Sequence, residues 1–431
     1  MDTTIVQADV MDWCKGYKGP KFHAILCDPP YELGFMGKDW DKTGIVFDPA
    51  TWEALAEHLH PGGFGMAFAS SRGWHRLAVA IEDAGLRIHP SIFGWVFGSG
   101  FPKATRIDTQ IDKAAGAERE VIGEYQWPDG RPRNTATHKT KRNGIYSDIK
   151  ADGAANDRSI ERPATDLARA WEGHRYGLQA MKPALEPIIV FQKPYEGKPV
   201  ESIVETGAGA LNIDGARIEG VPHSGGEHGT QIYGSNGNYT PGPNALGNPQ
   251  GRWPANFYLG DAEAAARLGE QSGERNGGGN ITAHPRDESM INFAQRQPHF
   301  NGFSDTGTAA RFFFNVNRQI DEADPVMYQA KASRKERDAG MEARNNHPTI
   351  KPIDLTRWLA TLLLPPVEYA PRRILVPFSG SGSEMIGAML AGWEEIIGIE
   401  MEREYVEIAR ARLEHWAKGK KQIGFDLRPR P

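Results

Sequence analysis

Cysteine and long apolar runs are both scarce in this chain of 431 residues. Its 2 cysteines, Cys14 and Cys27, cannot build a disulfide framework and suit a reducing cytosol. The first residues lack the basic segment and the apolar run of a signal peptide. The longest apolar stretch, near residues 358–367, is too short for a membrane span and contains Pro365 and Pro366. We therefore expect a cytoplasmic protein that does not contact a membrane.

Positive charge is not in excess. The chain carries 50 Lys and Arg against 55 Asp and Glu, a net charge of −5, so any nucleic-acid surface has to be local. One basic cluster consists of Arg131, Arg133, Lys139, Lys141 and Arg142. We interpret it as a set of phosphate contacts, with a solvated surface cluster as the alternative. Apolar residues make up 39% of the chain, which is enough for a sizeable core.

Strand-like and helix-like segments alternate near both ends of the chain. Short apolar runs typical of strands lie at residues 4–8, 24–27, 64–69, 88–97, 374–376 and 395–399. Helical periodicity covers residues 49–59, 74–84, 354–364, 383–390 and 403–416. This alternation predicts an α/β fold with a mostly parallel sheet, formed jointly by the N-terminal and C-terminal segments.

The middle of the chain is irregular and polar. A buried strand is expected at residues 185–192 and a helix at 262–268, whereas 225–251 and 269–307 are rich in Gly, Asn and Ser and are read as mobile loops. We predict four parts: residues 1–100 and 345–420 as the two portions of one α/β domain, 101–344 as a large insert, and 421–431 as a tail.

The first motif, Asp28-Pro29-Pro30-Tyr31, directly follows an apolar strand. Ligands of open α/β sheets bind at the carboxyl ends of strands. The prolines fix φ and stiffen the turn, so the Asp28 carboxylate and a backbone carbonyl can face the same ligand amine. Tyr31 can stack on a planar ring, which is worth about 1–3 kcal/mol per base. The alternative is a plain turn that ends a strand.

The second motif, Phe378-Ser379-Gly380-Ser381-Gly382, lies between a strand and a helix. Glycines let a ligand approach the backbone, and the start of a helix favours an anionic group. Glu400 follows about 20 residues later, at the end of the next predicted strand, where an acidic side chain can bind ribose hydroxyls. Together these residues predict a pocket for an adenosine-type cofactor.

A third motif occupies residues 346–352, Asn-His-Pro-Thr-Ile-Lys-Pro, just before a predicted helix. Its prolines favour an extended backbone. Thr349 and Lys351 can bind a carboxylate, while an ordinary loop before a helix is the alternative.

In these three motifs the chain resembles amino-directed DNA methyltransferases that use S-adenosylmethionine, in the permuted order of the beta group. The matching motifs lie at residues 28–31, 347–352 and 378–382, and the resemblance covers about 5–97 and 345–416. Residues 98–103 and 182–187 are also similar to stretches in phage and bacterial members. The resemblance implies a Rossmann-like methyltransferase sheet whose insert recognises the DNA target.

The resemblance also implies roles for individual residues. Asp28 and the carbonyl of Pro29 would accept hydrogen bonds from the target amine, Pro30 would hold the turn, and Tyr31 would stack on a flipped base. The implied cofactor-binding residues are Asp9, Thr349, Lys351, Phe378, Ser379, Gly380, Ser381, Gly382 and Glu400. No metal site is expected.

The sequence departs from the family pattern at two positions. Val376 stands where the cofactor motif usually has Asp, which removes a partner for the ammonium group of the cofactor's methionine moiety. The Asp28 carboxylate or a backbone carbonyl is then the candidate replacement. Glu384 stands where many members have Thr. Both changes bear on cofactor affinity more than on the fold.

In this family, Asp at the first position of the catalytic motif usually accompanies adenine N6, so Asp28 favours adenine over cytosine N4. Three alternatives stay open: a cytosine-N4 enzyme, a non-catalytic DNA-binding protein on the same fold, and an RNA methyltransferase. The expected partner is double-stranded DNA in a bacterial or phage-infected cell. A homodimer is possible, and a companion restriction enzyme is neither implied nor excluded.

Overall fold

The computed structural model describes residues 1–33, 41–97, 102–124, 159–218, 252–259, 262–272, 275–276, 306–307, 313–315, 334–341, 345 and 350–422. The chain forms two compact units. The main unit comprises Met1–Ser99 and Ala184–Pro431, and the small unit comprises Gly100–Pro183.

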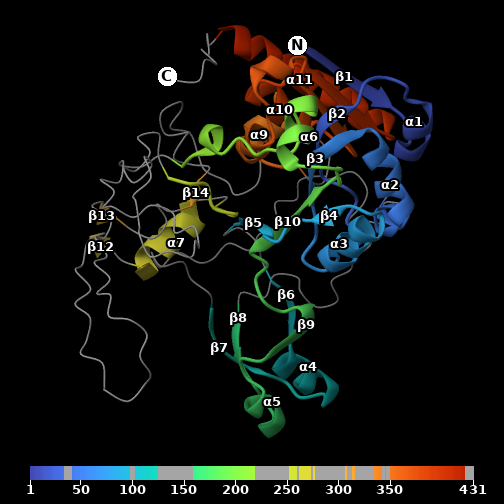
Figure 1. Cartoon of the computed structure of the whole chain (residues 1–431). Helices are drawn as coiled ribbons and strands as arrows, with labels where there is room; N and C mark the ends of the chain where they lie inside the picture. The colour runs from blue at the N-terminus through green and yellow to red at the C-terminus, as the bar shows by residue number, and fades with distance from the viewer. Residues whose placement is uncertain are drawn as a thin grey trace, which may run out of the picture. The chain divides into compact units, whose positions relative to one another are not determined.

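A large mixed sheet organises the main unit (Figure 1). Its strands follow the order β1 (Asp2–Gln7), β16 (Glu395–Glu400), β15 (Arg373–Pro377), β2 (Phe22–Cys27), β3 (Leu59–Phe68), β10 (Leu185–Gln192), β5 (Phe93–Val96), β11 (Phe257–Leu259) and β14 (Phe314–Asn315), with β4 (Arg87–Ile88) also paired to β10. The first five strands are mutually parallel, and β10 runs antiparallel to both of its main neighbours. The predicted α/β fold, with a mostly parallel sheet built from both ends of the chain, is confirmed.

Helices cover both faces of this sheet because successive strand residues point to opposite sides. In β2, Ala24 and Leu26 belong to one apolar core, and Ile25 and Cys27 to the other. The first core is closed by α9 (Ile353–Leu362), α10 (Ser383–Ala391) and α11 (Arg403–Gln422), and the second by α1 (Val10–Gly16), α2 (Pro49–Glu57) and α3 (Trp74–Asp83). Because β2 is buried on both faces, its sequence is a nearly continuous apolar run.

A glycine sets the spacing between α9 and α10. A Cβ atom on Gly387 would lie 2.6 Å from the backbone nitrogen of Arg357 and 2.4 Å from Oγ1 of Thr356. Thr356 Oγ1 in turn donates a hydrogen bond to the carbonyl of Ser383, at 3.0 Å. The two helices therefore pack backbone to backbone, which fixes the start of α10 relative to α9.

Local signals predicted several boundaries correctly. Asp48 caps α2, because its carboxylate accepts a hydrogen bond from the amide of Ala50 at 3.0 Å, and Pro49 occupies the first helical position. The single strand predicted over residues 88–97 is wrong. There the chain forms two strands, β4 and β5, and Pro90 lies between them without an N–H group for the ladder.

The main unit has further short elements at its margins. These are α6 (Pro199–Thr206), α7 (Ala262–Ser272), α8 (Arg334–Arg337) and the two-stranded pair β12 (Arg275–Asn276) with β13 (Thr306–Gly307). No helix in the described ranges is long and apolar enough to cross a bilayer.

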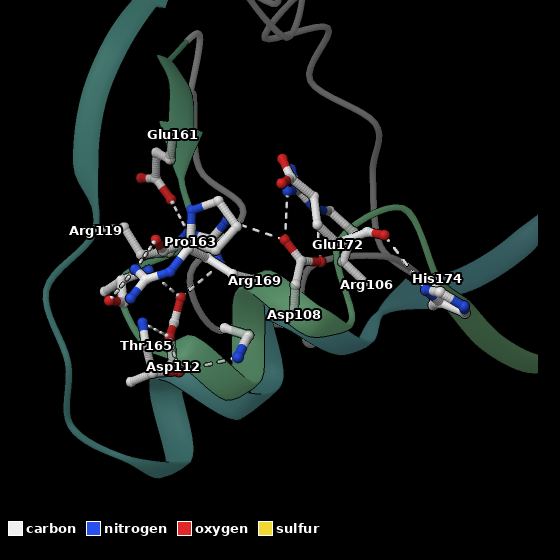
Figure 2. A network of polar contacts seen from close by, with 12 residues as sticks. Arg106, Asp108, Asp112, Arg119, Glu161, Pro163, Thr165, Arg169, Glu172 and His174 are labelled. Atoms are coloured by element: carbon white, nitrogen blue, oxygen red, sulfur yellow. Dashed lines mark hydrogen bonds and ion pairs between the residues drawn. The ribbon is translucent and has the colours of Figure 1, made fainter.

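The small unit is more ordered than its sequence suggested. It contains the antiparallel pairs β6 (Lys103–Arg106) with β9 (Arg175–Gln179) and β7 (Glu120–Glu124) with β8 (Ser159–Arg162), together with α4 (Ile107–Ala114) and α5 (Asp166–Ala170). Figure 2 shows the ion network that joins these elements. Arg119 contacts Asp108 at 3.0 Å, Asp112 at 2.9 Å and Glu161 at 3.1 Å.

Among the described residues of the small unit, Pro163 and Ala168 are the buried apolar ones, so the ion network takes the place of an apolar core there. The carboxylates of Asp108 and Asp112 are buried. Burial alone would raise the pKa of Asp108, but hydrogen bonds from Arg106 and Arg119 outweigh it and lower the pKa to about 2. A polar composition of this kind gives no apolar period, which is why sequence patterns did not predict these elements.

Candidate active site

A pocket of about 320 Å³ opens at the carboxyl ends of β1, β2, β15 and β16. This is the edge where open α/β sheets bind ligands. Its lining includes most of the predicted site residues, namely Asp9, Asp28, Pro29, Pro30, Tyr31, Lys351, Phe378, Ser379, Gly380, Ser381 and Glu400. Gly382 lies at the N-cap of α10, beside this lining. Thr349 is outside the described residues.

Asp28 follows the last residue of β2 and is held from one side. Its side chain is 14% exposed, and Oδ2 accepts a hydrogen bond from Nζ of Lys351 at 2.5 Å. Its other oxygen, Oδ1, is buried and has no hydrogen-bond partner in the described part of the chain. A buried acceptor without a donor is costly, so Oδ1 is suited to receive an N–H group from a ligand.

Lys351 is the cation that neutralises this end of the pocket. The residue is 4% exposed, and its Nζ also lies 3.7 Å from Oε2 of Glu186. Nζ sits 5.1 Å from the ring centroid of Tyr31 and 4.8 Å from that of Phe68. Burial by itself lowers the pKa of Lys351, but the Asp28 and Glu186 carboxylates outweigh it and raise that pKa above its usual value. The ammonium group therefore stays charged.

Tyr31 is oriented by a residue that sequence motifs did not single out. Its hydroxyl donates a hydrogen bond to Oε2 of Glu186 at 3.0 Å. Burial and the negative charges of Asp28 and Glu186 raise the pKa of Tyr31 well above its usual value, so it remains a neutral donor. Glu186 lies near the start of β10. Its sequence signals are its place in the stretch 182–187, to which no role was assigned, and its acidic side chain in a mainly apolar strand.

The glycine loop after β15 turns sharply at the mouth of the pocket. Phe378 has φ of 56° and Gly380 has φ of 49°, both in the left-handed region, and Gly382 has φ of 79°. The amide of Gly380 donates to Oε2 of Glu400 at 2.8 Å, and the amide of Glu402 donates to Oε1 at 2.8 Å. Burial raises the pKa of Glu400 and outweighs these hydrogen bonds, which act in the opposite direction.

Asp9 contributes to local structure as well as to the lining. Its Oδ1 accepts hydrogen bonds from the amides of Met11 at 2.8 Å and Asp12 at 3.1 Å, and so caps α1. The same side chain lines the pocket at the end of β1.

Glu384 lies in the first turn of α10 and lines the same pocket. It is 3% exposed, and its Oε1 atom has no hydrogen-bond partner among the described residues. Burial, reinforced by the negative charge of Asp28, raises the pKa of Glu384 to about 7. Val376, the other departure from the family pattern, is fully buried within the first apolar core.

Several of the predicted functional residues and loops lie outside the residues that the structure describes. The basic cluster Arg131, Arg133, Lys139, Lys141 and Arg142 lies outside the described residues, as do the glycine-rich stretch 225–251 and most of 269–307. In the ranges that the structure describes, no three His, Cys, Asp or Glu side chains are arranged to bind a metal ion.

Comparison with known proteins gives structural matches alone. No protein-family model matches the chain, and no curated protein matches it. Among solved structures, the chain is similar to the M1.HpyAVI–SAM complex, with 13% identity, 95% of this chain and 98% of the other covered, and a TM-score of 0.37. It is also similar to PvuII DNA methyltransferase (cytosine-N4-specific), with 11% identity and a TM-score of 0.40; the match covers 98% of this chain and 93% of the other.

The first of these structures contains SAM, and the second is named as a DNA methyltransferase. Because the identities are far below 25% and the TM-scores are below 0.5, the function proposed next rests on the side chains of the pocket.

Proposed function

We propose that this protein is a DNA methyltransferase that moves a methyl group from S-adenosylmethionine to an exocyclic amine, the N6 amine of adenine. The observation that carries the proposal is the state of Asp28. One of its oxygens is held by Lys351, and the other is buried in the pocket without a donor. Such an oxygen suits an N–H group that approaches from a bound base.

The pocket fits an adenosine-type cofactor in its residues and in its size. Its volume of about 320 Å³ lies within the roughly 300–1,000 Å³ of typical ligand sites. Glu400 ends the strand after the glycine loop, where its carboxylate would hold ribose hydroxyls. Phe378, Ser379, Gly380 and Ser381 would line the cofactor, Gly382 would let the loop turn close to it, and Asp9 would lie near its adenine. When bound, S-adenosylmethionine supplies an electrophilic methyl group.

The chain's own residues would activate the target amine by position and electrostatics. The lone pair of an exocyclic amine is delocalised into its ring. Hydrogen bonds from the amine to Oδ1 of Asp28 and to the carbonyl of Pro29 favour a pyramidal nitrogen, whose lone pair is available for attack. Lys351 holds Asp28 in place through their ion pair, and no covalent intermediate with the protein is needed.

Tyr31 would receive the base after it leaves the duplex. Flipping a base out costs a few kcal/mol, and stacking on an aromatic ring returns about 1–3 kcal/mol of it. The hydrogen bond from Tyr31 to Glu186 fixes the ring before the base arrives, so less orientational freedom is lost on binding. Lys351, 5.1 Å from the same ring, adds a cation–π contact.

Residues 101–344 are proposed as the region that recognises the target, and Thr349 as a further residue near the methionine end of the cofactor. Lys139, Lys141 and Arg142 are proposed phosphate contacts. Replacing them with Ala should weaken binding to all DNA sequences evenly and reduce the salt slope by about 0.9 per lost contact. A salt slope equal to that of the wild type would instead indicate a solvated surface cluster.

The test of the reaction is methyl incorporation from labelled S-adenosylmethionine into duplex DNA and into RNA, followed by identification of the methylated nucleoside. N6-methyl-2′-deoxyadenosine from the DNA supports the proposal. N4-methyl-2′-deoxycytidine would show that the target base is cytosine, and label in RNA alone contradicts the DNA assignment. Asp28→Ala should abolish transfer but retain cofactor binding. Glu57→Gln, an exposed change on α2 outside the pocket lining, is the matched control.

A further inference from the structure

Glu384 is a buried carboxylate whose charge the fold leaves unmatched. It is 3% exposed, and Oε1 has no hydrogen-bond donor within the described ranges. Its place in the first turn of α10 favours negative charge only modestly. That gain is small beside the cost of desolvating a lone carboxylate. The side chain lines the pocket, so a bound ligand can reach it.

Of the two cations near Glu384, Lys351 is paired with other carboxylates, whereas Nε and Nη2 of Arg412 have no hydrogen-bond partner among the described residues. Lys351, just before α9, pairs with Asp28 at the end of β2 and with Glu186 of β10. Arg412 of α11 is fully buried, and its Nη1 donates to the Ser381 carbonyl at 2.6 Å, to Ser381 Oγ at 2.9 Å and to Ser383 Oγ at 3.2 Å.

No ion pair within 4.0 Å joins either cation to Glu384 in the described part of the chain. Arg412 thus braces the glycine loop. The charges of Lys351 and Arg412 act to lower the pKa of Glu384, but burial and the charge of Asp28 outweigh them.

We infer that Glu384 binds the α-ammonium group of the methionine moiety of S-adenosylmethionine, and so replaces the aspartate that this chain lacks at Val376. The inference rests on the proposed function for the identity of the ligand. Val376 is fully buried in the apolar core, so nothing at that position offers an acceptor. Glu384, eight positions further along the same strand–loop–helix segment, brings a carboxylate to the pocket from the helix.

Asp28 is the less suitable partner for that ammonium group. Lys351 already neutralises it at 2.5 Å, so a second cation there would be repelled by the first. Glu384 has no close cation, and an ammonium group that donates to Oε1 would satisfy the hydrogen bond and the charge together. The two buried carboxylate oxygens that lack a partner in the described lining are thus divided: Asp28 Oδ1 for the target amine and Glu384 Oε1 for the cofactor.

The test compares two ligands that differ only in the amino group. S-Adenosylhomocysteine and its deamino analogue, in which hydrogen replaces that group, are titrated into the full chain at pH 8 by calorimetry. The wild-type protein should bind S-adenosylhomocysteine about 10- to 100-fold more tightly than the analogue. Glu384→Gln should remove most of this preference and leave the affinity for the analogue nearly unchanged. Glu402→Gln, an exposed change in the same lining, should keep the preference.

Other outcomes overturn the inference. A Glu384→Gln protein that keeps the full preference shows that another group binds the ammonium, and equal weakening of both ligands shows a purely structural role. If Asp28→Asn removes the preference and Glu384→Gln does not, Asp28 is the partner. A wild-type protein that binds the two ligands equally contradicts the inference without touching the proposed function. One that binds neither ligand overturns both.

Discussion

Replacing Glu384 by Gln should stabilise the ligand-free protein, and the gain should depend on pH. The pKa of Glu384 is raised from its ordinary value of 4.5 to about 7 by burial and by the charge of Asp28. Between these two values the folded protein holds a proton that the unfolded chain has lost. Stability therefore falls as pH rises through this window, and it levels off above pH 7.

The size of the effect follows from the shift. At about 1.4 kcal/mol per pKa unit, a rise from 4.5 to about 7 corresponds to roughly 3 kcal/mol of stability lost by pH 8. Gln has nearly the same shape and no charge, so the variant avoids this loss. We expect wild type and variant to be nearly equal at pH 4.5, and the variant to be more stable by up to roughly 3 kcal/mol at pH 8.

Thermal unfolding of wild type and variant at several pH values between 4.5 and 8 measures this difference without ligand. Groups that do not interact with Glu384 titrate alike in both proteins and cancel. A difference between wild type and Glu384→Gln that stays constant across the pH range, or a variant less stable than wild type at pH 8, would refute the reasoning.

Three further predictions test the fold and the site. Gly387→Ala should destabilise the main unit by more than about 2 kcal/mol, because the new Cβ would meet a backbone nitrogen at 2.6 Å. Gly16→Ala is the control, because there is open space around Gly16. Thermal unfolding measures the stability of both variants. Arg119→Met should lower the stability of the small unit by about 3–5 kcal/mol, because it leaves buried carboxylates unpaired. Hydrogen exchange should then show faster amide exchange across the small unit and unchanged exchange in β2 and β15. Tyr31→Ala should lower methyl transfer about 10- to 100-fold while Tyr31→Phe, which keeps the ring, should lose far less; equal losses would contradict a stacking role.

Periodicity and turn residues predicted most elements of the main unit because its strands are buried on both faces. The segment of β10 was predicted residue for residue over 185–192, and the glycine loop was placed correctly between β15 and α10. The elements that the sequence did not predict are short or polar. Helix α1 spans Val10–Gly16, too few residues for a periodic pattern, and its start depends on the cap from Asp9. The run over 88–97 looked continuous because its apolar content hid the break at Pro90.

Motifs identified the two sides of the pocket but not the contacts between them. Asp28 and Lys351 each belong to a recognisable motif, yet they are 323 positions apart and their ion pair depends on how the sheet closes. Tyr31 and Glu186 are 155 positions apart, and Glu186 enters from a strand antiparallel to its neighbours. Such pairings leave no local trace in a single sequence, because each partner satisfies its own segment's pattern without the other.

The matching of charges in the pocket explains why Glu384 stands apart from its neighbours. Among the described lining residues, Lys351 is the one basic side chain. Three other lining carboxylates have partners of their own: Asp9 caps α1, Asp41 accepts the amides of Glu32 and Leu33 at 2.8 and 3.2 Å, and Glu400 accepts two amides. A fold optimised only for stability would not bury a further acid here. We therefore interpret the unpaired carboxylate of Glu384, at the start of α10, as a loss of stability that is retained because it serves ligand binding.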